Sequence, residues 1–268
     1  MAQKKNEQEH QMLFDIRGRR KNVVRVVYAV LALLMGLSLF LVVGPNVGGI
    51  FDSETTSGEE TAQRFEDRAE AIELKLKKDP ENPDLLLALT RQRIYAGNAL
   101  AVINPETGAV QQTTDSRLQL QQASNAWTEY LEATDDPSPA GAQLTAPMLF
   151  SLAETGTSVA EIEANVAAAA EAQEIVARAR PSLGTLSTLA IYSLFTFDYP
   201  KAKKVEEEAR GYANSKFERE NLENQLEETE KRAREVEKSF VEFEKATKGQ
   251  GKESLESPLG GLSGSLGP

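Results

Sequence analysis

The side chains best suited to catalysis and metal binding are almost absent from this sequence. It contains no cysteine and one histidine, His10, which lies in a polar stretch near the N-terminus. The sequence therefore offers no thiolate nucleophile, no zinc–thiolate site and no histidine-based triad. We expect no catalytic residue, no bound metal and no cofactor.

Carboxylates are the remaining candidates for acid–base chemistry. The sequence has 41 Asp and Glu against 30 Lys and Arg, a net charge of −11. Carboxylate pairs on such acidic helices are typical of solvated faces, and no phosphate-binding loop, dinucleotide fingerprint or nucleophile elbow accompanies them. We therefore predict that the protein is not an enzyme.

The charge is unevenly distributed along the chain. Residues 1–25 carry a net charge of +4, so the remaining 243 residues carry −15. An acidic body repels phosphate backbones, which argues against nucleic acid as a partner. The basic segment directly precedes a long apolar run, and this order is typical of a membrane protein.

The apolar run, residues 23–44, is predicted to be a transmembrane helix. From Val26 to Val43, 16 of 18 residues are apolar, and 22 helical residues extend about 33 Å, enough to cross a hydrocarbon core. A cleaved signal peptide and a buried core helix are the alternatives. The length of the run, the lack of a small-x-small site after Val43 and the missing polar face favour an uncleaved anchor.

The flanks of the run predict its orientation. Basic residues crowd the N-terminal side, whereas acidic residues come first on the other side, before Arg64. The positive-inside rule then places residues 1–22 in the cytoplasm and the body on the extracytoplasmic face of the plasma (inner) membrane. Residues 45–58 are expected to form a polar linker.

The body of the chain has the pattern of an all-α protein. Apolar residues recur at intervals of three and four, and strand signals are nearly absent. The first three predicted helices end before Asp79, near Gly97 and before Asp136, with a polar segment at 102–115. The next four are expected at 143–154, 157–180, 185–196 and 201–212. Short breaks between them predict antiparallel helical hairpins.

Several short motifs recur within these hairpins. Residues 79–82 and the prolines Pro80, Pro137 and Pro181 end helices, and residues 95–98 are expected to form a turn. Small and apolar residues then follow in a fixed order: Leu186, Leu189 and Ala190, the sequence Asp-Tyr-Pro-Lys-Ala at 198–202, and Ala209.

On these motifs, residues 59–215 resemble the tetratricopeptide repeat (TPR) family, whose unit is 34 residues and two helices. The chain departs from the pattern, because the repeat-ending prolines are 57 and 44 residues apart and Phe197 replaces the usual turn glycine. An unrelated helical bundle is the alternative.

The resemblance implies a TPR-like helical-hairpin solenoid whose inner wall binds other proteins. Its order of basic tail, single span and outward repeats is also similar to membrane-anchored bacterial proteins that assist the translocon or act as envelope chaperones, which suggests envelope or exported polypeptides as partners. The partner-binding residues implied by the family pattern are Leu87, Arg91, Tyr95, Ser187, Ile191 and Phe195. Packing between helices is the competing role for each.

Residues 216–248 are predicted to form a long charged C-terminal helix, since no proline or glycine interrupts them. Apolar residues alternate by four and three from Leu222 to Thr247, which is a heptad seam. We favour a capping helix over the last repeat. A structural envelope protein that self-associates as a homodimer through the seam is the alternative. Residues 249–268, rich in Gly, Ser and Leu, are expected to be disordered.

Together these features predict an all-α protein with a single N-terminal transmembrane helix, a TPR-like solenoid and a long capping helix. The expected function is that of a membrane-anchored scaffold or adaptor that assists secretion or envelope-protein assembly. An enzyme of unrecognised type is a further alternative.

Overall fold

The structure is a computed structural model that describes residues 58–104 and 110–247. Their regular secondary structure is helical apart from one short hairpin, which confirms the predicted all-α class. The predicted cytoplasmic tail, membrane span, most of the linker and the Gly/Ser/Leu-rich tail lie outside the described residues. Among the residues that are described, no helix combines the length and the apolar character needed to cross a bilayer.

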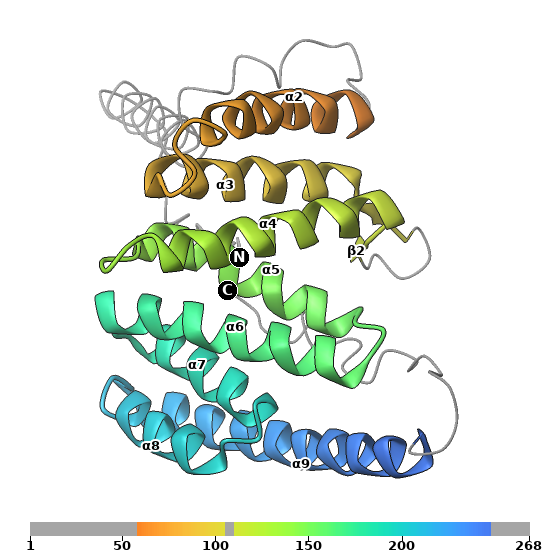
Figure 1. Cartoon of the computed structure of the whole chain (residues 1–268). Coiled ribbons are helices and arrows are strands. Elements are labelled where there is room, and N and C mark those ends of the chain that lie inside the picture. Colours follow the sequence, from red (N-terminus) through yellow and green to blue (C-terminus); the bar gives the residue numbers. More distant parts are fainter. Residues whose placement is uncertain (1–57, 105–109, 248–268) are drawn as a thin grey trace, which may run out of the picture. The chain divides into compact units, whose positions relative to one another are not determined.

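The described helices stack largely in chain order (Figure 1). Each packs mainly on its neighbours in sequence, and the last helix, α9, packs back on α7 and, less extensively, on α8. This order confirms the expectation of successive helical hairpins. The helices are α2 (Gly58–Leu76), α3 (Pro83–Leu100), α4 (Thr114–Glu132), α5 (Pro139–Glu154), α6 (Val159–Ala179), α7 (Leu183–Phe195), α8 (Tyr199–Arg210) and α9 (Lys216–Thr247).

Helix starts are specified by local capping. Ser182 and Thr185 form a capping box at α7, in which each side chain accepts a hydrogen bond from the other residue's backbone N–H. At α5 the Ser138 hydroxyl accepts from the backbone N–H of Gly141 at 3.2 Å, and Pro139 takes the first position, where no helical bond is lost. The sequence interpretation that began this helix at residue 143 is therefore four residues too late.

Gly97 corrects the prediction of a turn at 95–98. The helix α3 continues through it to Leu100, and Gly97 is buried against α4. A Cβ atom at this position would lie 2.5 Å from Cδ2 of Leu120. The glycine is needed because it allows two helices to approach closely, rather than because the chain turns there.

A small antiparallel hairpin occupies part of the polar segment predicted at 102–115. Its strands are β1 (Val102–Ile103) and β2 (Val110–Gln111), with Val102 paired to Gln111 and Ile103 to Val110. Two-residue strands leave no period-two pattern, so the sequence carried no strand signal here.

The interior combines an apolar core with a few buried polar links. Trp127 is among the largest fully buried side chains of this core. The Arg93 guanidinium donates to Glu73 of α2 at 2.5 Å and to Gln119 of α4 at 2.8 Å. One arginine of α3 therefore ties three successive helices together.

The seam of α9 faces the body of the same chain. Its apolar members Leu222, Leu226, Val236 and Phe240 are buried in the core shared with α7 and α8. This arrangement matches the capping-helix interpretation. It also means that self-association through the seam requires α9 to leave its place on α7 and α8.

Phe197, between α7 and α8, adopts the backbone conformation that favours glycine. Its φ is 60°, which an L side chain rarely adopts. The ring packs edge-on against Phe240 of α9, with 5.9 Å between ring centroids. Phe197 therefore occupies a strained turn at the position where the TPR pattern has glycine, and its ring packs against α9.

Candidate partner-binding grooves

Two grooves border successive parts of α9, and both have α7 as one wall. The first, of about 680 Å³, lies between α8 and α9; we call it the charged groove. The second, of about 770 Å³, lies between the start of α9, α7 and residues of α5 and α6; we call it the amide groove. Neither groove follows from the sequence, since each is formed by side chains from three or more helices.

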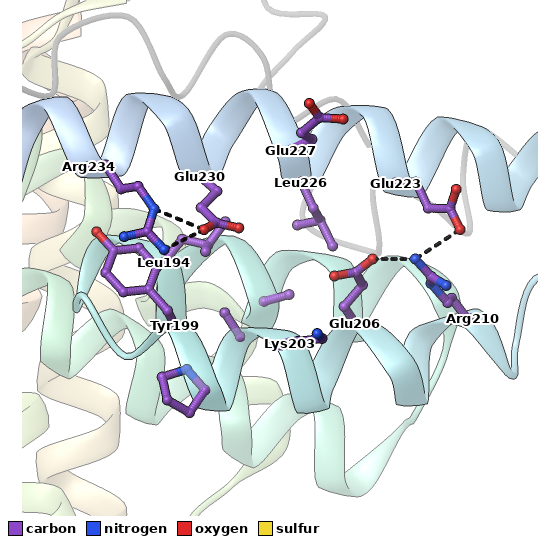
Figure 2. Close-up of a pocket in the computed structure, with 13 residues that line it drawn as sticks. Leu194, Tyr199, Lys203, Glu206, Arg210, Glu223, Leu226, Glu227, Glu230 and Arg234 are labelled. Carbon is purple, nitrogen blue, oxygen red and sulfur yellow. Dashed lines mark hydrogen bonds and ion pairs between the residues drawn. The ribbon is translucent and has the colours of Figure 1, made fainter.

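The charged groove is lined by acidic and basic side chains, most of which pair with one another. Figure 2 shows Arg210 between Glu206 and Glu223, with both nitrogen–oxygen distances at 2.8 Å. Arg234 donates to Glu230 at 2.6 Å. These contacts include a link from α8 to α9, so the charges hold the walls of the groove together.

Tyr199 lies at one end of the charged groove. Its hydroxyl donates to Glu237 at 2.7 Å, and the Arg234 guanidinium lies 4.0 Å from the ring centroid. Burial, and then the hydrogen bond to the Glu237 carboxylate, raise the pKa of Tyr199 to about 12. The phenol therefore stays a protonated donor well above neutral pH, and it links α8 to α9.

The amide groove differs because most of its polar lining is uncharged. Its one charged residue, Glu218, accepts hydrogen bonds from the backbone N–H groups of Asn214 and Ser215. The apolar lining includes Val176, Leu183 and Leu222. The carboxamides and hydroxyls are those of Gln143, Gln173, Ser182, Thr185, Ser187, Thr188, Tyr192, Asn221 and Gln225.

Several of these neutral groups have no hydrogen-bond partner among the described residues. Gln173 donates to the carbonyl of Thr185 at 2.9 Å. Among the described residues, the side chains of Gln143, Asn221 and Gln225 form no hydrogen bond. Each carboxamide has two donor hydrogens and a carbonyl acceptor, so the groove presents unused hydrogen-bonding capacity of both kinds.

Pro147 adds a backbone acceptor to the same wall. It lies inside α5 and has no N–H, so the carbonyl of Gln143 lacks its usual helical donor. Both residues line the amide groove. A carbonyl freed in this way is available to an N–H group from outside the helix.

The predicted stripe on α7 divides between this groove and the core. Ser187 and Ile191 both line the amide groove, although Ile191 is only 2% exposed. Phe195 is 3% exposed and packs edge-on against Phe150, with ring centroids 5.7 Å apart. A contact between Phe195 and a partner therefore requires the core to open.

The predicted stripe on α3 lies apart from both grooves. Leu87 is partly buried and lies close to Gly141 at the start of α5. Arg91 is half-buried. Tyr95 is exposed, and its ring lies 5.3 Å from that of Phe65 of α2. The structure thus keeps the two predicted stripes separate, and a partner contact at Leu87, Arg91 or Tyr95 stays a prediction.

The groove residues on α5 and α9 are not predicted from the sequence. Gln143, Asn221 and Gln225 are exposed polar residues on helices, and in a sequence such residues indicate ordinary solvated surface. The proline within a predicted helix was the one available signal, since it marks a broken backbone bond.

The described residues contain no group of three or more His, Cys, Asp or Glu side chains placed to hold a metal ion. The chain matches no protein-family model. No curated protein and no solved structure is similar to it at a significant level. The resemblance to tetratricopeptide repeats therefore stays a prediction.

Proposed function

We infer that this protein is a membrane-anchored scaffold of TPR-like helical hairpins that binds extended segments of other proteins in the amide groove. The partners are envelope or exported polypeptides on the extracytoplasmic face, and binding assists their secretion or assembly. The observation that carries the proposal is the neutral, partly unpartnered polar lining of the amide groove.

The chemistry of that lining suits a peptide backbone. An extended peptide presents alternating N–H donors and C=O acceptors, and a carboxamide can satisfy both. Asn221 and Gln225 lie one turn apart on α9, and Gln143 and Pro147 of α5 line the same groove. The partly buried Leu183 belongs to the same lining, so the groove also offers apolar surface to the side chains of a peptide.

The membrane anchor in this proposal is inferred from the sequence. Residues 23–44 are long and apolar enough to span a bilayer, and the basic flank before them favours a cytoplasmic N-terminus. The acidic body then faces exported chains.

The test compares two matched substitutions on α9. Asn221→Arg places a long charged side chain in the amide groove, and Glu227→Arg places the same side chain in the charged groove; both original residues are exposed. The probes are fluorescein-labelled, uncharged ten-residue peptides with apolar residues at alternate positions, titrated against the full chain in nanodiscs.

We expect saturable binding that Asn221→Arg weakens at least about tenfold, equivalent to about 1.4 kcal/mol. Glu227→Arg should change the affinity less than about twofold, and both variants should keep the wild-type thermal melt. Equal weakening by the two substitutions, or no saturable binding by the wild type, would contradict the proposal.

A further inference from the structure

The β1–β2 hairpin exposes apolar side chains that no other part of the described chain covers. Ile103 and Val110 are each 70% exposed, and Val102 is 49% exposed. Ile103 and Val110 are cross-strand partners, so their side chains project from the same face of the hairpin. Paired β-branched residues are usually found against a core, and here they form a small apolar patch at the surface.

The base of the hairpin is held in place by hydrogen bonds. The Thr113 hydroxyl donates to the carbonyl of Leu100 at 3.1 Å. The Gln112 carboxamide donates to Ser151 of α5 at 2.7 Å and accepts from Thr155 at 3.1 Å. The patch is therefore presented from a fixed position at the end of α5.

The chain enters the described fold at the same end. Gly58, the first residue of α2, lies against the end of α3, where a Cβ atom would be 2.6 Å from the carbonyl oxygen of Ala99. Val102 follows Ala99 by three residues. The hairpin thus lies beside the N-terminal end of α2, where the described body begins.

The length of the connection to the predicted membrane span limits the distance to the bilayer. Thirteen residues separate Gly44 from Gly58, and a fully extended chain of this length reaches at most about 45 Å. The first turn of α2, at the same end, carries Glu59 and Glu60, which anionic lipids would repel. A contact here would rest on the apolar patch rather than on charge.

We propose that Ile103 and Val110 dip into the interfacial region of the bilayer in which the chain is anchored, so that the hairpin is a second, shallow membrane contact. The ligand is the apolar boundary of a zwitterionic lipid surface. The inference rests on the membrane anchor of the proposed function. Two contacts, one spanning and one interfacial, would limit how far the body tilts and would keep one end of the helical stack at the membrane.

The absence of cysteine makes the experiment direct. Ile103→Cys and, as a matched control, Phe217→Cys each give the full chain a single thiol for an environment-sensitive fluorophore; Phe217 is 69% exposed and lies at the start of α9. The chain is reconstituted into phosphatidylcholine vesicles with lipids that carry a quencher near the headgroup. Flotation of the vesicles shows separately whether the chain is anchored.

We expect the label at residue 103 to be quenched at least about twofold more than the label at residue 217. A label at Gln111→Cys leaves the natural side chains of Ile103 and Val110 in place. If these side chains make the membrane contact, quenching of this label should fall when Ile103→Asp and Val110→Asp are introduced together.

Three results would overturn the inference. Co-flotation with equal quenching at 103 and 217 refutes the hairpin contact and leaves the anchor intact, whereas loss of co-flotation refutes both. Quenching at 103 that depends on the ratio of chain to lipid would assign the patch to contact with a second copy instead.

Discussion

The two grooves beside α9 have similar volumes but satisfy their polar groups in opposite ways. In the charged groove, Arg210 and Arg234 pair with carboxylates of α8 and α9. In the amide groove, Asn221 and Gln225 have no partner among the described residues, and the carbonyl of Gln143 has lost its helical donor. Most charged groups of the first groove are paired, and one of these pairs joins α8 to α9, whereas several polar side chains of the second groove have no partner among the described residues.

This difference explains why we assign binding to the amide groove. A ligand that enters the charged groove must replace existing ion pairs, which offsets the contacts that it gains. A ligand in the amide groove replaces only water. Volume alone does not separate the two sites; the state of their hydrogen-bonding groups does.

The largest expected effect on stability comes from weakening the packing of α9, the helix that both grooves share. Leu226 lines the charged groove and Leu222 the amide groove, and both are buried. Leu226→Ala and Leu222→Ala should each lower the free energy of unfolding by about 2–4 kcal/mol, because each leaves a cavity under α9. Urea denaturation followed by circular dichroism measures the change.

Val241→Ala is the control for these substitutions, since Val241 is an exposed residue of the same helix. It should change the free energy of unfolding by less than about 0.5 kcal/mol. If Leu226→Ala and Val241→Ala behaved alike, α9 would not be docked as described. Under conditions in which both variants are fully folded, Leu222→Ala should also weaken peptide binding more than Leu226→Ala does.

A smaller effect is expected at the broken bond of α5. Pro147→Ala restores an N–H that can bond the carbonyl of Gln143, so it should raise the free energy of unfolding by about 2 kcal/mol. The same change should weaken peptide binding, because the freed acceptor is lost. Calorimetry and peptide titration test the two effects together.

The matched control is Pro139→Ala at the first position of α5, where proline costs no helical hydrogen bond. It should lower stability by no more than about 1 kcal/mol, through greater freedom of the unfolded chain. If Pro147→Ala and Pro139→Ala stabilised the protein equally, the carbonyl of Gln143 would not be the group that gains a hydrogen bond.

The smallest effect concerns the polar contacts themselves. Tyr199→Phe removes the hydrogen bond to Glu237 and should cost about 1 kcal/mol at neutral pH, whereas Ser187→Ala in the amide groove should cost less than about 0.5 kcal/mol. Urea denaturation of both variants tests whether only the charged groove uses its polar groups for stability.

Tyr199 also predicts a pH dependence. The unfolded chain loses the tyrosine proton near pH 10, and the raised pKa of about 12 lets the folded chain keep it. The folded state thus binds more protons between these values, and its stability falls as pH rises through them. Tyr199→Phe should remove this part of the fall. An identical slope in the wild type and the variant would contradict the contact with Glu237.

Sequence analysis predicted the helices well where their ends are set by neighbouring residues. The long helix was expected at 216–248 and is found at Lys216–Thr247, because no residue within it breaks the backbone pattern. Gly97 misled the analysis, since the same residue permits either a turn or a close helix contact, and only Leu120 of α4 decides which.

Local chemistry in the sequence was thus enough to determine that the described body is helical, where most of its helices begin and end, and which face of α9 is apolar. Only the tertiary structure decided that α9 lies on α7 and α8, and that Gln143 and Asn221 line the same groove. The physical reason is that caps and periodicity act between residues a few positions apart. A groove, in contrast, depends on long-range packing, and the polar residues at its edge carry no pattern that distinguishes them from solvated surface.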